Sequence, residues 1–507
     1  MKRTKKCFPF HQCIFLKPIL WLGLLGISQT YTLCQPASLT LTLEDVIRIA
    51  KDSSLQAFIN QNMYLGDYWS YRTYQAELRP SLNLSSNPFN YTRAINEEYN
   101  FLDSTYQYIK QENVNSTVNL TLRQNISRTG GNIYVDSDLG RIQNFNKNFT
   151  QYSSTPLRIG LSQGLFAFNP YKWKKRLEPL KFEMAKKDYI ESAEEIAVRA
   201  VNHYFSLLSA QINLEIAENN FANADTLYQI SKKRFKLTTI SQEDLFTLEL
   251  DLINATNQLE AARNQFKRAQ TRLLSFLRMD DSLQVQLDIP GKVPDYDINP
   301  SLALEKAMDN NPVNMQHEIE LLQAQREVER AQKSRFDIDL NMSFGLNQND
   351  DDIQGTYTNL LDQEKVRLSL YIPIVDWGLA KGKYNLAVMQ REVLEAQLEQ
   401  ADIDFRQDII MTVEEFNNQH EIIKRAARAD TLARKTYAIT KKRFLIGKAG
   451  IVKLNANEQK MITARRNYLN ALNNFWEYYY NLRQLTLYNF ESNQSLGEDF
   501  DEAFKLE

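Results

Sequence analysis

The chain has few helix breakers, little usable cysteine and no long apolar run. Its 507 residues include only 16 Gly and 13 Pro, a composition that favours long helices. Cys7 and Cys13 lie in a leader-like segment, so cleavage there would leave Cys34 without an internal disulfide partner. Beyond that segment no apolar stretch approaches the roughly 18–20 residues of a transmembrane helix. A membrane-embedded form of the mature chain would therefore use strands.

The charge balance and the missing motifs exclude two broad classes of function. The formal net charge is -2, so no basic field favours nucleic acid as a partner. The four His are scattered, and no HExxH, GxSxG, Walker A or GxGxxG motif is present. We therefore expect no enzyme, no cofactor and no metal site, with the His residues on helix surfaces or at interfaces. Residues 350–352, three consecutive Asp, resemble a cation site only superficially and are interpreted as a solvated loop tip.

Residues 1–28 have the features of an export signal. Lys2, Arg3, Lys5 and Lys6 precede an apolar stretch at 18–27, and residues 26–28 (Gly-Ile-Ser) form a small-x-small cleavage site. A retained anchor is the alternative interpretation. Cys34 would be a candidate for lipidation, although Leu33 departs from the small residue expected before a lipidated Cys.

The dominant feature is an internal duplication. Residues 158–276 align with 367–485 at a constant shift of 209 positions, most clearly where 230–235 (ISKKRF) meets 439–444 (ITKKRF). The N-terminal helices align at a shift near 257, which places Ala50 on Ala307. The two shifts differ by 48 residues, an insertion in the first copy. We divide the chain into a first repeat (29–292, with an inserted hairpin at about 86–156), a second repeat (293–488) and an acidic, loosely ordered tail (489–507).

Long helices are predicted in both copies. Four segments are predicted to be helical: 42–78, 180–236, 300–335 and 378–445. The regions that follow the two longest ones, 245–273 and 454–482, carry apolar residues at steps of three and four, which places them on one face of a helix. Heptads sustained over four repeats indicate coiled-coil packing, with an ordinary helical bundle core as the alternative. A helix of about 60 residues is roughly 90 Å long, which implies a rod-like object.

Short segments of period two lie between the helices. Residues 337–346 and 365–372 alternate apolar with polar side chains, and the first copy shows the same alternation near 81–85 and 157–161. The pattern is typical of transmembrane barrel strands, although a half-buried soluble sheet gives the same alternation. The insertion adds alternating runs at 117–123 and 133–139 around a turn signal at 128–132, so we expect an extra hairpin there. The sequence leaves open whether this hairpin adds strands to the sheet or forms only a loop above it.

The order helix, strand, strand, long helix, heptad helix, present twice, resembles the TolC-type outer-membrane efflux proteins. Residues 302–312 resemble that family's opening motif, 78–84 the entry to its first strand and 373–378 the exit of its last strand. The resemblance implies a mixed α and β membrane protein that forms a homotrimer. Each subunit would give four strands to one barrel in outer-membrane lipid, and the helices would continue as a periplasmic α-helical tunnel. Such a duct is a passive conduit in tripartite efflux or type I secretion, driven by an inner-membrane pump through a periplasmic adaptor (membrane fusion) protein.

The resemblance also suggests where a partner and a gate would act. The basic residues before each helix end are ordinarily solvated helix faces, but their duplication favours an adaptor-docking tip formed by Arg234, Phe235, Thr238, Arg443, Phe444 and Gly447. Thr238 replaces the Gly that the family has at the tip turn and that Gly447 retains. Lys453 stands where an acid often helps to close the tunnel, so a contact from Glu243 or Asp244 to Lys453 is a candidate gate.

A second function of a different class is a soluble periplasmic coiled-coil adaptor or scaffold. The alternating strands, with their apolar outer faces, argue against this alternative. Neither the cargo nor the partner pump follows from the sequence.

Overall fold

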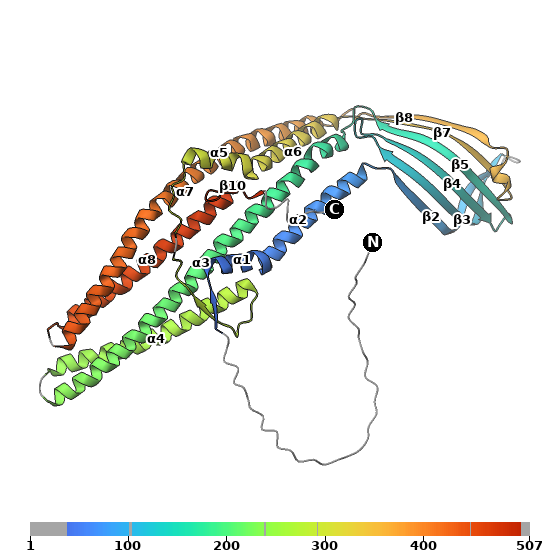
Figure 1. Ribbon diagram of the computed structural model, residues 1–507. Helices are drawn as coiled ribbons and strands as arrows, with labels where there is room; N and C mark the ends of the chain where they lie inside the picture. The colour runs from blue at the N-terminus through green and yellow to red at the C-terminus, as the bar shows by residue number, and fades with distance from the viewer. Residues whose placement is uncertain (1–37, 101–103, 238–239, 292, 447, 498–507) are drawn as a thin grey trace, which may run out of the picture.

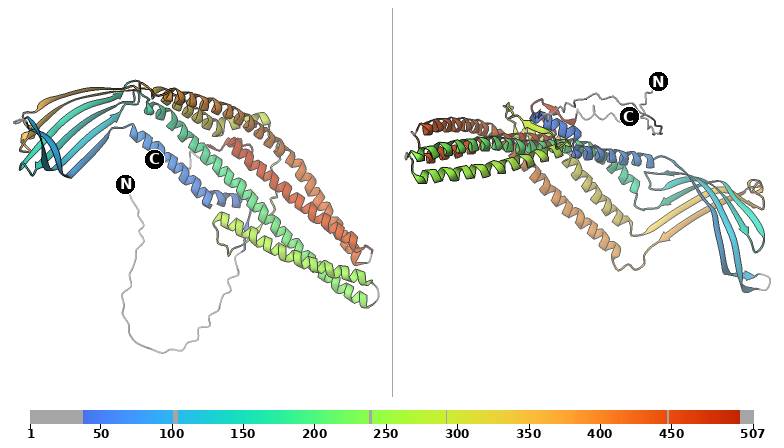
Figure 2. Two further views of the ribbon diagram at one scale, coloured as in Figure 1. Left: turned by 180° about the vertical axis from the view of Figure 1, so that it is seen from behind. Right: turned by 90° about the horizontal axis from the view of Figure 1, so that it is seen from below.

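The computed structural model describes residues 38–497 apart from 101–103, 238–239, 292 and 447. The predicted leader, Cys34 and the last ten residues lie outside this range. The described chain is elongated, with a curved sheet at one end and the tips of two helical hairpins at the other (Figure 1). The same separation of sheet and tips is visible from behind and from below (Figure 2).

The helices follow the duplication closely. They are α1 (Leu43–Ser53), α2 (Leu55–Glu77), α3 (Pro170–Lys236) and α4 (Gln242–Leu277) in the first copy, and α5 (Pro300–Asn310), α6 (Val313–Lys333), α7 (Leu379–Leu445) and α8 (Ile451–Thr486) in the second. Helices α3 and α7 have 67 residues each, and α4 and α8 have 36 each. At 1.5 Å per residue the longer pair spans about 100 Å, so the rod-like prediction is confirmed.

Two helices that the sequence analysis treats as continuous are broken. The prediction over 42–78 fails at Ser54, whose backbone is extended and whose Oγ accepts a hydrogen bond from Ala57 N at 3.0 Å to begin α2. The prediction over 300–335 fails at Asn311, which is extended (ψ 141°) because the proline at position 312 disfavours a helical residue before it.

One antiparallel sheet contains six strands in the order β2-β3-β4-β5-β7-β8. Their bounds are β2 Ser81–Asn100, β3 Thr105–Asn125, β4 Asn132–Asn144, β5 Phe149–Gly164, β7 Asp337–Asp350 and β8 Leu361–Tyr371. A short parallel pair, β1 (Ser38–Leu41) with β6 (Gln284–Leu287), lies beside the helices. Among the described strands, β2 pairs only with β3 and β8 only with β7, so the six-stranded sheet has two open edges.

The inserted hairpin belongs to this sheet, which corrects the expected number of strands. The resemblance implied four strands per subunit, whereas β3 and β4 make six. Strand β3 pairs with β2 from Arg123 to Thr105, and β4 bridges β3 to β5. The insertion joins the sheet because its alternation of apolar and polar residues continues that of the neighbouring strands.

One face of the sheet is apolar across all six strands. The register places Leu84 opposite Leu120, Val135 opposite Ile159 and Leu340 opposite Leu368. Side chains on this face are exposed, among them Leu82, Leu84, Leu120, Leu122, Ile133, Leu157, Ile159, Phe344, Val366, Leu368 and Leu370. The other face carries Asn, Ser, Thr, Asp and Arg. The polar-apolar alternation predicted for the strands is therefore confirmed.

The main apolar core lies midway along the helical part, where α1, α3, α4, α7 and α8 meet. Tyr204, Phe416 and Phe475 are fully buried in it. None of the described helices has a stretch long and apolar enough to cross a bilayer.

The start of the C-terminal tail is ordered, which corrects the prediction of a loose segment from residue 489. Strands β9 (Tyr488–Asn489) and β10 (Gln494–Ser495) form a small hairpin. Tyr479 on α8 donates a hydrogen bond from its hydroxyl to Glu491 Oε2 at 3.2 Å. Glu491 therefore helps to dock the start of the tail on α8.

Candidate functional site

Four of the six predicted tip residues lie at the ends of the long helices. Arg234 and Phe235 are in the last turn of α3, and Arg443 and Phe444 are at the equivalent places on α7. Arg443 is exposed and Phe235 is 38% exposed. Phe444 is half-buried and lines a cavity between the two helical hairpins. Thr238 and Gly447 lie outside the described residues.

In the described part of one chain, the predicted gate residues Glu243, Asp244 and Lys453 form no hydrogen bond or ion pair with each other. Ser241 caps α4 by accepting a hydrogen bond from Asp244 N at 3.0 Å, and its hydroxyl donates to Asp244 Oδ2 at 2.8 Å. Asp244 is thereby held at its own helix N-terminus, a common position for an acid. Glu243 and Lys453 are exposed, and no hydrogen bond or ion pair joins Glu243 or Asp244 to Lys453 in the described part of the chain.

A different polar group connects the α3–α4 hairpin to the α7–α8 hairpin. Asn223 on α3 accepts a hydrogen bond from Lys441 Nζ at 2.6 Å and donates from Nδ2 to the Tyr437 hydroxyl at 3.3 Å. Asn455 on α8 donates to Asp251 Oδ2 on α4 at 3.4 Å. These contacts surround a cavity of about 450 Å³ just inside the tips. We call Asn223, Asp251, Tyr437, Lys441, Asn455 and Glu458 the hairpin joint.

Burial perturbs the acid-base groups of the hairpin joint. Burial raises the pKa of Glu458 above its ordinary value; the negative charge of Asp251 adds to the shift and Lys441 opposes it. Burial, assisted by Glu458, also raises the pKa of Tyr437 to about 12. Lys441 is therefore the cation that balances the carboxylates of the hairpin joint.

The hairpin joint is absent from the sites predicted above, although the repeat contains a signal for it. Three members recur 209 positions earlier, since Tyr228, Lys232 and Glu249 correspond to Tyr437, Lys441 and Glu458. Asn223 and Asp251 correspond instead to Leu432 and Lys460. The repeat alone does not say which face of each hairpin meets the other, and that face decides which residues come into contact.

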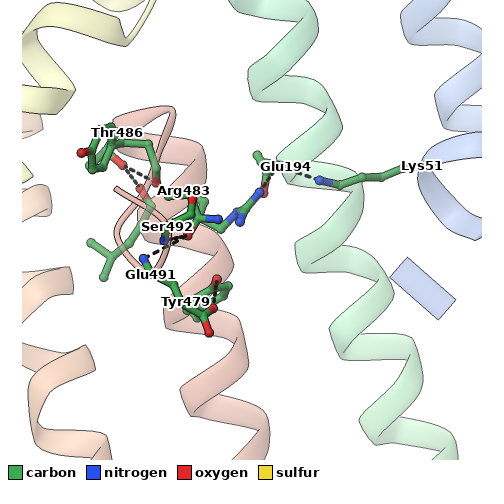
Figure 3. Close-up of polar contacts among 10 residues, drawn as sticks. Lys51, Glu194, Tyr479, Arg483, Thr486, Glu491 and Ser492 are labelled. Carbon is green, nitrogen blue, oxygen red and sulfur yellow. Dashed lines mark hydrogen bonds and ion pairs between the residues drawn. The ribbon is translucent and has the colours of Figure 1, made fainter. Parts of the chain in front are cut away.

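A buried charge cluster joins three helices in the middle of the rod. Glu194 on α3 is only 3% exposed. It accepts from Lys51 Nζ of α1 at 2.6 Å and from Arg483 Nε of α8 at 2.9 Å (Figure 3). Burial alone would raise the pKa of Glu194, but Lys51 and Arg483 together hold it below the ordinary value. The cluster therefore fastens the two repeats to each other through one shared carboxylate.

The polar face of the sheet contains its own ion pair. Arg158 on β5 donates from Nε to Asp136 Oδ1 on β4 at 3.0 Å, and Asp138 is 3.6 Å from the same guanidinium. Beside them the ring of Tyr134 covers Gly160, where an added Cβ would lie 2.1 Å from Tyr134 Cζ. Gly160 is therefore needed for the close approach of β4 and β5.

The described His and acidic residues can be compared with the expectations for them. Within the described ranges, no three His, Cys, Asp or Glu side chains are grouped so that they would hold a metal ion. The prediction for His420 is wrong, because this residue is buried against Phe416 and Phe475, with Nε2 3.2 Å from Tyr296 O. Residues 350–352 are exposed, as predicted, and form local turns through Asp350 and Asp352 side chains.

Several solved structures share this architecture. The chain is similar to the CmeC outer membrane channel of Campylobacter jejuni, with a TM-score of 0.65 and 15% identity over 91% of this chain and 88% of that one. It is also similar to the outer membrane protein VceC of Vibrio cholerae, with a TM-score of 0.62 and 12% identity over 88% and 95% of the two chains. The MtrE outer membrane channel of Neisseria gonorrhoeae gives a TM-score of 0.58 and 14% identity over 88% of each chain.

The second repeat matches a sequence family as well. No curated protein matches the chain in sequence. Residues 303–486 match the family model described as Outer membrane efflux protein, and they run from α5 to the last residue of α8. The duplicated strand and long-helix architecture agrees with the fold expected from the resemblance. Residues 303–486 therefore resemble the outer membrane efflux proteins in sequence, and the described chain shares the fold of outer membrane channels.

Proposed function

We propose that the chain forms a trimeric exit duct in the bacterial outer membrane and performs no chemistry. The observation that carries the proposal is the exposed apolar face across six strands, which continues directly into two helices of 67 residues. Open strand edges are not tolerated in lipid, so neighbouring copies supply the closure. The family resemblance implies three copies. The same resemblance implies that transport is driven by an inner-membrane pump through a periplasmic adaptor, in tripartite efflux or type I secretion.

Membrane fractionation separates this proposal from the soluble adaptor or scaffold. The mature protein is expected in the outer-membrane fraction, released only by detergent, because a soluble protein rarely leaves so large an apolar face in water. Recovery of the mature protein in the soluble fraction without detergent would reject the duct.

We propose that the tips bind the adaptor. The support is the duplicated basic end of α3 and α7, with exposed Arg443 at the extremity of the rod. The double substitution Arg443→Glu and Gly447→Phe should abolish export in cells while leaving the protein in the outer membrane. The matched control is Arg466→Glu, a charge reversal at an exposed position on α8 away from the tip. Export that survives the double substitution would refute docking at the tip.

We propose further that the hairpin joint keeps the tips closed at rest. Lys441→Met removes the 2.6 Å hydrogen bond to Asn223 and the cation that balances Asp251 and Glu458. A hydrogen bond to a charged group is worth about 1.5–3 kcal/mol, so the ratio of open to closed channels should rise by roughly 10- to 150-fold. Single-channel recording in planar bilayers measures that ratio. Lys442→Met, at the exposed neighbouring position, should leave it unchanged, and equal behaviour of the two variants would contradict the proposed gate.

A further inference from the structure

The two edge strands of the sheet are suited to pair with each other in a neighbouring copy. Strand β2 begins after α2 and runs away from the helices, whereas β8 runs back toward them and ends before α7. The two strands are therefore antiparallel, and each is paired on one side only. A β2 edge that meets the β8 edge of the next copy continues the antiparallel order of the sheet without interruption.

The side chains at both edges match this pairing. Leu84 on β2 is 71% exposed and Val366 on β8 is 74% exposed. Both belong to the apolar face, as the pairs Leu84–Leu120 and Met342–Val366 show. Edge-to-edge pairing of copies therefore extends the apolar face around the assembly and keeps the polar residues on the opposite face.

The inserted hairpin has one apolar and one polar face, like the other strands of the sheet. Leu120 on β3 and Val135 on β4 lie on the apolar face, in register with Leu84 and Ile159. Thr121, which pairs with Asp136, lies on the polar face. A surface loop above a membrane has no need of such an apolar row, whereas a strand in lipid does.

We propose that three copies close a single barrel of eighteen strands, in which β2 of each copy pairs with β8 of the next. This inference rests on the proposed function, and it sets the diameter of the barrel through which the duct opens. With strands about 4.8 Å apart and tilted about 40°, eighteen strands give a barrel roughly 36 Å across, against roughly 24 Å for twelve. Barrels of 16–18 strands leave an aqueous channel. The polar face, with Arg158 and Asp136, lines that channel.

Fluorescence quenching by lipid tests whether the inserted strands form part of the wall. A thiol-reactive fluorophore is attached to Leu120→Cys or Val135→Cys in a background without native Cys, and the protein is reconstituted in vesicles of brominated phosphatidylcholine. Both positions should be quenched as strongly as Leu368→Cys on β8. Thr121→Cys, next to Leu120 but on the opposite face, should be quenched several-fold less.

The possible outcomes separate this inference from the proposed function. Quenching at position 368 without quenching at 120 and 135 would leave the duct intact and overturn the eighteen-stranded barrel, because the inserted hairpin would then lie outside the lipid. No quenching at any of the three positions would overturn both proposals.

Cross-linking tests the pairing of β2 with β8 independently. Ser85→Cys on β2 is combined with Arg367→Cys or Ser369→Cys on β8, all on the polar face, and a short bifunctional thiol reagent is added to membranes. Covalent dimers and trimers are expected for at least one combination. The control pairs Ser85→Cys with Ser343→Cys on β7, one strand in from the edge, and should give several-fold fewer of them. Equal yields from edge and control pairs would contradict the proposed contact.

Discussion

Replacing Glu194 with Gln is expected to lower the free energy of unfolding of the helical part by about 3–5 kcal/mol, the usual cost of breaking a buried ion pair by removing one partner. Among the described residues, Glu194 is the only carboxylate that forms an ion pair with both Lys51 and Arg483. The amide of Gln has nearly the same shape as the carboxylate of Glu. The decrease in the free energy of unfolding therefore measures the effect of removing the charge, without a change in side-chain volume. Thermal unfolding in detergent, followed by circular dichroism, measures the effect.

The neighbouring residue provides the control. Glu195 is half-buried, and among the described residues its ion pair is with Arg199 one turn away, so Glu195→Gln should change the free energy of unfolding by about 0.5 kcal/mol or less. If the two variants unfold alike, the buried cluster does not fasten the repeats together.

The contribution of Glu194 also has a predicted dependence on pH. The pKa of Glu194 is lower in the folded chain than its ordinary value of 4.5. The unfolded chain therefore takes up the proton first as the pH falls. The stabilisation is complete above pH 4.5 and is lost as the pH falls through the lowered pKa. The difference between the wild-type protein and Glu194→Gln should shrink in the same range.

Leu368→Arg is expected to prevent assembly in the membrane. Leu368 is exposed on the apolar face of β8, opposite Leu340. Arginine on the lipid face of a barrel costs about 2–4 kcal/mol at the bilayer midplane, and the trimer repeats this cost three times. The fraction of protein that runs as an SDS-resistant trimer from outer membranes should fall severalfold or more.

Ser369→Arg is the matched control for Leu368→Arg. It introduces the same side chain one residue further on, where the alternation of the strand directs it to the polar face. Trimer yield should stay near that of the wild-type protein. Equal losses from both variants would mean that the two faces do not differ in contact with lipid, which contradicts the proposed orientation of the sheet.

The sequence alone predicts the rod and the strands because both depend on long, regular patterns. In the helices apolar residues recur every three or four positions, and in the strands they recur every second position, over many residues. Because the chain is duplicated, each pattern in one copy can be compared with the same pattern in the other. Helices α3 and α7 obey the 209-residue shift at both ends, from Pro170 and Leu379 to Lys236 and Leu445. The inserted hairpin follows from the same reasoning, but its place inside the sheet depends on pairing with β2 and β5.

The features that escaped prediction are local or depend on tertiary contacts. Helices α4 and α8 are capped at their C-terminal ends by Arg278 and Leu487, equivalent residues in the left-handed region with φ of 56° and 46°. Neither residue is the Gly that usually marks such a helix end, so the residue types at these positions do not predict where the helices stop. The hairpin joint escaped for a different reason. Asn223 and Lys441 are 218 residues apart, and only the packing of one hairpin on the other brings them together.

Electron cryomicroscopy of the detergent-solubilised mature protein tests the central claim most directly. We expect a threefold-symmetric particle with a barrel at one end, continued by a helical tube whose long helices span about 100 Å. Monomers with free sheet edges, or a compact particle without a tube, would contradict it.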